Sequence, residues 1–213
     1  MKASSLLNHA QVVSFSSMTR LDGYVSSLDL SHVTRVVNIS MLQTLLKEKC
    51  TGQDPMLAVC VYGYLTRFDV DCPETIALYC SSCSELLKNT DNQYLICMNM
   101  ECGEFKNTRF DRPAPCPRYN VRADISDETG TLSSVKIYQS FLEKKLGSPA
   151  EFVGLTHETR TAYKWQFMLK PVKMTIAMRL PASDSGLFHL MLVDVRPTTL
   201  EEMSIKMPSP AII

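Results

Sequence analysis

Four of the eight cysteines lie in one short stretch, where their spacing could hold a metal ion. They form two pairs, Cys80 with Cys83 and Cys97 with Cys102. The run between the pairs, SELLKNTDNQYLI, predicts two short strands around a polar turn at 88–92, so a hairpin would bring the pairs together. Four thiolates around one point make the closed tetrahedral site that zinc accepts. We therefore predict one structural Zn²⁺ ion, bound by this cysteine quartet.

The alternative is four buried free thiols, or two redox pairs, and the choice depends on the compartment. The stretch after Met1, KASSLLNHAQVVSFSS, is too short in apolar residues and too polar for a secretory signal. No run approaches the roughly eighteen apolar residues of a membrane helix. We expect a reducing compartment, where a disulfide framework is disfavoured and metal ligation is favoured.

The other cysteines carry weaker signals. Cys60 lies in an apolar run and is expected in the core, whereas Cys50 and Cys72 are isolated. Cys116 follows the quartet in Pro-Ala-Pro-Cys-Pro, and it is either a substitute metal ligand or a thiol of a rigid loop.

The composition is that of a soluble globular protein, with 45% hydrophobic and 21% charged residues. Basic and acidic side chains number 22 each, so the net charge predicts no partner. A chain of 213 residues fits one large domain, or one domain plus an arm. We predict an N-terminal arm or linker at 1–37, a domain at 38–203 with its ribbon at 79–105, and a tail at 204–213.

The pattern outside the quartet predicts about five strands. Met56–Phe68 is rich in β-branched and aromatic residues, and Gly63 inside it indicates a bulge or a sharp bend. A hairpin is expected around the turn at 128–131. The further strands are expected at 119–127, 132–138, 172–180 and 187–195.

Short helices are expected between these strands. They are predicted at Asn38–Lys49 with Ser40 as N-cap, at 139–146 before Gly147, and from the N-cap Thr156 to about Lys170. Five strands with a helix before the last two suit an OB-fold, a small Greek-key barrel. The predicted fold is thus mainly β, a five-stranded OB-fold barrel with an inserted four-cysteine zinc ribbon and a few short helices.

Three pieces of sequence together resemble one family. They are the quartet, ADISDETGTLSSVKIYQSFLEKKLG and the closing MLVDVRPTTLEE. Over about Asn38–Met203 the chain resembles the third single-stranded-DNA-binding domain of the replication protein A large-subunit family. The piece THETRTAYKWQFMLKPVKMTI is similar to that family's meiosis-specific OB-domain relatives. The resemblance implies a zinc-ribbon OB-fold that binds single-stranded DNA with other OB-fold subunits of a recombination or repair complex, in the nucleus and on chromosomes.

The sequence departs from this family in three respects. The family spaces its cysteine pairs four and then two residues apart, whereas the order here is two and then four. The family stacks bases on two rings in the strand after the hairpin; Tyr138 matches one, but the other falls near Ser133 or Ser134. The family's long trimerisation helix has no counterpart expected after Thr199.

An OB-fold binds single strands through a basic groove and exposed rings on which bases stack. The hairpin strands offer the candidates Tyr119, Arg122, Lys136 and Tyr138. A basic run before the hairpin offers the candidates Lys106, Arg109, Arg112 and Arg118 for phosphate contact. The alternatives are a solvated loop for the basic run and a core-edge position for Tyr138.

No pattern indicates catalysis. Gly-x-Ser-x-Gly, a phosphate-binding glycine loop and His-Glu-x-x-His are all missing from the sequence. Asp124, Asp127 and Glu128 are expected to make a turn rather than bind a metal, and Trp165, among apolar neighbours at helical spacing, is expected in the core. Two functions remain open, single-stranded DNA binding in recombination or repair, and an OB-fold module that binds other proteins.

Overall fold

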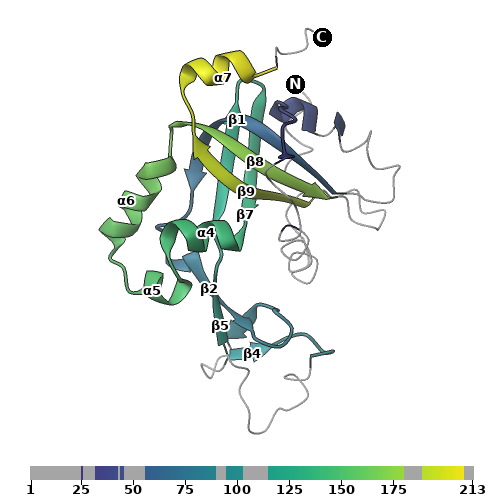
Figure 1. Ribbon diagram of the computed structural model, residues 1–213. Coiled ribbons are helices and arrows are strands. Elements are labelled where there is room, and N and C mark those ends of the chain that lie inside the picture. Colours follow the sequence, from purple (N-terminus) through teal and green to yellow (C-terminus); the bar gives the residue numbers. More distant parts are fainter. Residues whose placement is uncertain are drawn as a thin grey trace.

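The computed structural model is built mainly from strands, with short helices between them (Figure 1). It describes residues 25, 32–42, 44–45, 56–89, 95–102, 115–179 and 189–208. No helix in this part of the chain is long and apolar enough to cross a membrane. The predominance of strands over helices confirms the predicted mainly-β class.

Five strands close into one barrel. In spatial order they are β1 (Met56–Phe68), β6 (Arg122–Asp127), β7 (Gly130–Ile137), β9 (His189–Pro197) and β8 (Pro171–Arg179), which pairs back to β1. The β7–β9 contact is parallel and the other four are antiparallel. The predicted hairpin is β6–β7, and the two predicted C-terminal strands are β8 and β9. A five-stranded Greek-key barrel of this kind is the OB-type architecture that the sequence predicts.

Strand β1 pairs with two neighbouring strands, and Gly63 lies where its pairing partner changes from one strand to the other. Residues 56–64 pair with β8, while residues 64–68 pair with β6. A Cβ atom on Gly63 would lie 2.3 Å from the backbone oxygen of Ser126 on β6. Only glycine permits this approach, which agrees with the bend predicted at this residue.

The described residues of the predicted N-terminal arm lie against the barrel. Val36 bridges Cys60 in parallel, and the Cys60 thiol donates to the carbonyl oxygen of Val33 at 3.3 Å. Val37 is only 2% exposed and belongs to the main core. Val25 packs with residues of β8 and β9 in a second apolar cluster. These described residues of the predicted arm thus pack on the barrel rather than standing apart from it.

One carboxylate ties this segment to the β6–β7 turn. Asp127 accepts hydrogen bonds from the backbone N–H groups of Thr129 and Gly130, and its second oxygen accepts from the N–H of Ile39 at 2.7 Å. The turn-making role expected for Asp127 is thus observed. The short 3₁₀ helix η3 (Ile39–Met41) begins at Asn38, whose side chain caps the N–H of Met41, so the prediction of Ser40 as N-cap is wrong.

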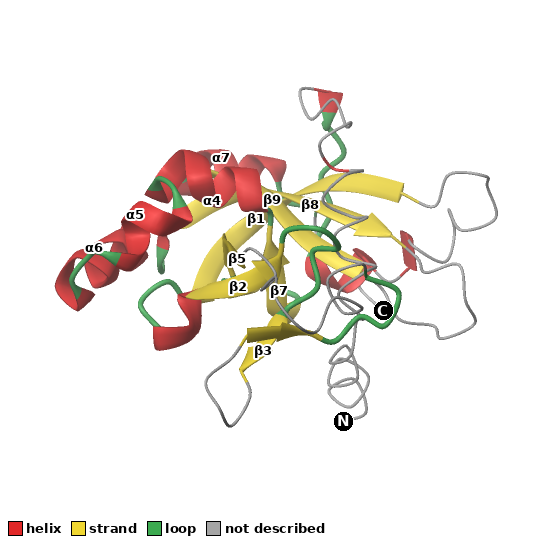
Figure 2. Cartoon of the chain, turned by 90° about the horizontal axis from the view of Figure 1, so that it is seen from below, coloured by secondary structure: helices red, strands yellow, loops and turns green. Residues whose placement is uncertain are grey.

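Three helices connect β7 to β8 and gather on one side of the barrel (Figure 2). They are α4 (Gln139–Leu146), α5 (Pro149–Val153) and α6 (His157–Phe167). Gly147 ends α4 at a φ of 87°, and Thr156 caps α6, as predicted. Helix α6 ends three residues before the predicted Lys170. Helix α5, which begins with a Ser148–Glu151 capping box, and α7 (Leu200–Lys206) were not predicted.

The chain between β1 and β6 forms the ribbon, which projects from one end of the barrel (Figure 1). Its stem pairs β2 (Ile76–Cys80) with β5 (Pro115–Tyr119). Beyond the stem, β3 (Leu87–Asn89) pairs with β4 (Leu95–Cys97), which confirms the predicted hairpin inside the quartet. The turn η4 (Pro73–Thr75) leads from the barrel into the stem.

Replacing Gly63 with alanine should destabilise the barrel, because the new methyl group meets backbone rather than a movable side chain. Overpacking of this kind costs about 1–3 kcal/mol. We expect the melting temperature to fall by about 2–4 °C for each kcal/mol. Gly154→Ala is the matched control, since its Cβ would lie 3.4 Å from the nearest atom, the carbonyl oxygen of Glu151. Equal melting temperatures for the two variants would contradict the assignment of Gly63 as a position that accepts only glycine.

Candidate metal centre and nucleic-acid interface

The structure gathers the cysteine quartet into one cluster. The four Sγ atoms lie within 4.8 Å of one another, and three of the four residues are buried. The Sγ atoms of Cys80 and Cys102 are 3.8 Å apart, and those of Cys83 and Cys97 are 3.4 Å apart. A tetrahedral zinc site with Zn–S bonds of about 2.3 Å has S–S edges of about 3.8 Å. The cluster therefore has the size of a four-thiolate metal site.

Backbone hydrogen bonds in the two turns aim the thiols at one point. The N–H of Ser84, which has a φ of 58°, donates to the carbonyl oxygen of Cys80 at 2.9 Å. In the second turn, the N–H of Cys102 donates to the carbonyl oxygen of Asn99 at 3.0 Å. Each pair thus sits on a tight turn at the end of a strand, β2 for the first pair and β4 for the second.

The thiols influence one another's ionisation. Burial raises the pKa of Cys97 to about 12. Burial also raises the pKa of Cys83, but hydrogen bonds from the Glu85 backbone and from the other thiols outweigh it and lower this pKa overall. A bound cation displaces thiol protons, so metal binding here would release protons and would weaken at acidic pH.

Four sulfur ligands leave no position for a water or a substrate. Such sites hold zinc or an iron–sulfur centre, and a tetrahedral site of this size suits zinc in a structural role. Cys116 lies in the stem, where it pairs with Tyr79, and it is not a member of the cluster. Cys60 is buried against the N-terminal segment, which confirms its predicted core position.

Arg118, a predicted phosphate contact, is engaged inside the ribbon. Its guanidinium donates to the hydroxyl of Ser84 at 3.0 Å and lies 5.8 Å from the centre of the Tyr79 ring. Ser84 belongs to the turn of the first cysteine pair. Arg118 therefore joins the stem to this turn. Lys106, Arg109 and Arg112, the rest of the basic run, lie outside the described residues.

Arg122 and Lys136 are opposite one another on β6 and β7. Arg122 is exposed, Lys136 is half-buried, and the residues next to them along each strand, Ala123 and Val135, point into the core. Both cations thus lie on the outward face of the barrel. The Arg122 guanidinium donates to the carbonyl oxygen of Ser134 at 3.2 Å.

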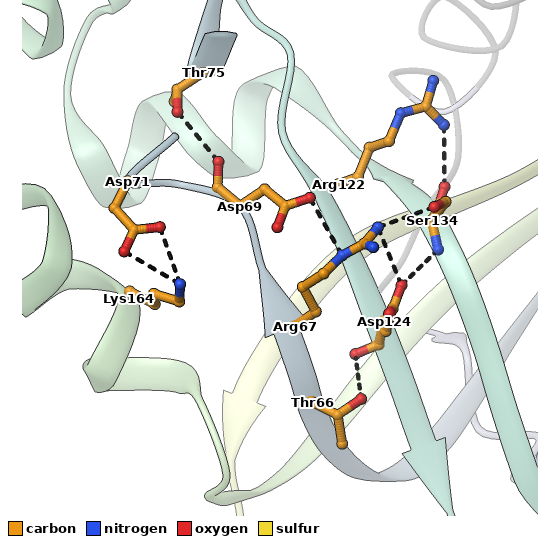
Figure 3. A network of polar contacts seen from close by, with 9 residues as sticks. All are labelled: Thr66, Arg67, Asp69, Asp71, Thr75, Arg122, Asp124, Ser134 and Lys164. Carbon is orange, nitrogen blue, oxygen red and sulfur yellow. Dashed lines mark hydrogen bonds and ion pairs between the residues drawn. The ribbon is translucent and has the colours of Figure 1, made fainter. Parts of the chain in front are cut away.

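A third cation, Arg67, reaches this face from β1 at a break in the pairing register (Figure 3). Its guanidinium lies 3.2 Å from Asp69 and 3.3 Å from Asp124, and it donates to the hydroxyl of Ser134 at 2.9 Å. The side chain is still 42% exposed. Sequence reasoning missed Arg67, because the signal was a single arginine in an otherwise apolar strand.

The structure removes Tyr119 from the candidate contacts. It lies on β5, not on the β6–β7 hairpin, and is 2% exposed. Its ring packs edge-on against Phe152 at 5.4 Å, and its hydroxyl donates to the carbonyl oxygen of Gly147 at 2.9 Å. Burial raises its pKa above the ordinary value. The predicted placement of Tyr119 on a hairpin strand is therefore wrong, and its ring, as part of the core, presents no face on which a base could stack.

Tyr138 was predicted on the second hairpin strand, but β7 ends at Ile137 and Tyr138 is the N-cap residue of α4. Its ring is half-buried and packs against both apolar clusters. Its part in stacking stays a prediction. Trp165 shows the opposite behaviour, since it was expected in the core and is 53% exposed on α6. The core-facing residues of α6 are Tyr163 and Phe167, and Trp165 is about 200° from each around the helix.

Zinc content tests the quartet. We expect about one zinc ion per chain in purified protein, measured by elemental analysis. Cys83→Ser should lower both zinc content and melting temperature, because a structural zinc site contributes directly to folding. Cys116→Ser is the control and should keep its zinc. If folded protein that was never exposed to a chelator contains no zinc, the assignment of the quartet as a zinc site is contradicted.

Comparison with known proteins adds three findings. No family model matches the chain. The chain is 28% identical to the meiosis-specific with OB domain-containing protein of Macaca fascicularis over 154 residues, covering 71% of this chain and 31% of that protein. It is 28% identical to the protein of the same name from Rattus norvegicus over 164 residues, covering 75% and 33%, and 25% identical to protein hold'em of Drosophila melanogaster over 160 residues, covering 73% and 32%.

The chain thus spans about a third of the length of the curated relatives it matches. Among solved structures it is similar to a chain of a replication protein A heterotrimer bound to single-stranded DNA, with a TM-score of 0.54 and 11% identity. That alignment covers 89% of this chain and 46% of the other. At this identity the likeness concerns the fold, which is the OB-type barrel predicted from the sequence.

Proposed function

We propose that this chain is a single-stranded-DNA-binding OB-fold domain with one structural zinc ion. The observation that carries the proposal is the cation group on the outward face of the barrel, formed by Arg67, Arg122 and Lys136. OB-folds bind oligonucleotides on the face of their second and third strands, which are β6 and β7 here. Cations at this face can contact phosphates of a single strand.

We further propose a binding role without catalysis, in DNA recombination or repair and with a meiotic context. The names of the relatives, together with the likeness to a replication protein A heterotrimer bound to single-stranded DNA, support this assignment. Other OB-fold proteins are the proposed protein partners, and a nuclear, chromosome-associated location follows from the role. The zinc ribbon, which we place at about 79–105 of a domain that ends near residue 203, acts as a structural support.

A second function is favoured by a specific observation. Asp69 and Asp124 already form ion pairs with the Arg67 guanidinium, and Tyr119 is buried. A face whose cations are partly neutralised by neighbouring carboxylates suits an OB-fold module that binds another protein. The two functions differ in whether the isolated domain binds an oligonucleotide in a salt-dependent way.

Binding of a fluorescent oligo-dT, followed by anisotropy at about 50 and 200 mM salt, separates the two functions. Arg122→Ala and Lys136→Ala should each weaken binding and lower the salt slope by about 0.7, since one fewer phosphate is neutralised. The double variant should lower the slope by about 1.4. Lys145→Ala, which removes an exposed cation from the last turn of α4, is the control and should bind as the wild type does.

Two results would count against the proposal. If the wild type binds and both variants keep its affinity and slope, the nucleic acid lies on another face. If the wild type fails to bind even at low salt, the protein-interaction module becomes the better explanation. Circular dichroism of every variant ensures that a loss of binding is not a loss of folding.

A further inference from the structure

Trp165 is the sole tryptophan of the chain, and over half of its side chain is exposed. None of the residues of α6 is buried, so the helix is not held by a deep apolar face. It is held instead by Phe167, whose ring packs edge-on against Phe68 at 5.7 Å, and by polar contacts to Asp71. The largest ring on this helix therefore faces solvent while smaller rings make the packing contacts.

Polar contacts hold α6 beside the connection that leaves β1. Lys164 donates to both carboxylate oxygens of Asp71, at 3.0 and 3.1 Å, and the Thr161 hydroxyl donates to Asp71 at 3.4 Å. Trp165 follows Thr161 by four residues, so it lies one turn along the same side of the helix. Trp165 is thus on the side of α6 that includes Thr161, one of the two residues that contact Asp71.

This connection leads directly to the cation group. Asp71 is two residues beyond Asp69, which contacts Arg67, and Figure 3 shows the Asp71–Lys164 pair next to the Asp69–Arg67 pair. A second link comes just after α6, where the N–H of Leu169 donates to the carbonyl oxygen of Leu65 on β1 at 3.0 Å. OB-folds use the connection between their first two strands, together with the outward face, to bind oligonucleotides.

We propose that Trp165 is the ring on which a base of single-stranded DNA stacks at this edge of the outward face. The inference rests on the proposed function and adds a residue to it. Every base presents a π-face, so an exposed indole can stack on any sequence. The exposed Lys170, shortly after α6, can contact a phosphate of the same strand. A base is favoured over a protein partner because α6 contacts Asp71, in the connection that leaves β1, and this connection also contains Asp69, which pairs with Arg67 of the cation group.

The emission of Trp165 provides a direct test, because no other tryptophan contributes to it. We expect oligo-dT to quench this emission in wild-type protein, with the same midpoint as the anisotropy titration. Trp165→Ala should weaken binding by about five-fold to over a hundred-fold, and Trp165→Phe should retain most of the affinity. Gln166→Ala, the neighbouring exposed position on α6, is the control and should bind normally.

The outcomes separate this inference from the proposed function. If anisotropy reports binding but the emission is unchanged and Trp165→Ala binds as the wild type does, the inference is overturned and the proposed function stands. If the wild type shows no anisotropy change at low salt, both are overturned, and Trp165 is better explained as a contact for another protein. The quenching measurement uses unaltered protein, so it decides the matter even if Trp165→Ala fails to fold.

Discussion

Strand β1 has to pair with β8 along its first part and with β6 along its last part, and every other element depends on this sharing. The change of partner falls at Gly63, where the backbone of β6 comes too close for any side chain. With a straight β1 the barrel would not close, and the edges of β6 and β8 would be left unpaired. The N-terminal segment at Val36 and Val37 then covers the edge of β1 that β6 does not reach.

The same strand organises both candidate sites. It ends just before the chain that contains the cysteine quartet, so the ribbon is inserted between two neighbouring barrel strands. Arg118 and the β2–β5 stem fix the first cysteine turn, while Arg67 and Asp69 place charge where β1 leaves the barrel. The cysteine quartet is therefore separated from the outward face of the barrel.

Local patterns in the sequence were sufficient for much of this arrangement. The spacing of Cys80, Cys83, Cys97 and Cys102 depends only on two turns and one hairpin, and alternation along the β6–β7 hairpin reveals which side chains face outward. Tertiary contacts decided the rest. Tyr119 was expected at the binding surface and Trp165 in the core, but Tyr119 packs against Phe152 and is 2% exposed, whereas Trp165 is 53% exposed. The role of Asn38 over Ser40 likewise depends on how η3 meets the distant turn at Asp127.

The pairing of β1 with β8 also bears on the order in which the molecule forms during synthesis. Met56 must meet Arg179, and this contact has to wait until the end of β8 has left the ribosome. Contacts so distant along the chain form slowly, because much conformational entropy is lost before they stabilise anything. The cysteine quartet and the β6–β7 hairpin are local, so they can form while the barrel is still open. During that interval the unpaired edge of β1 is exposed to other nascent chains, and a ribbon already closed around a metal ion would shorten the loop that folding has left to close.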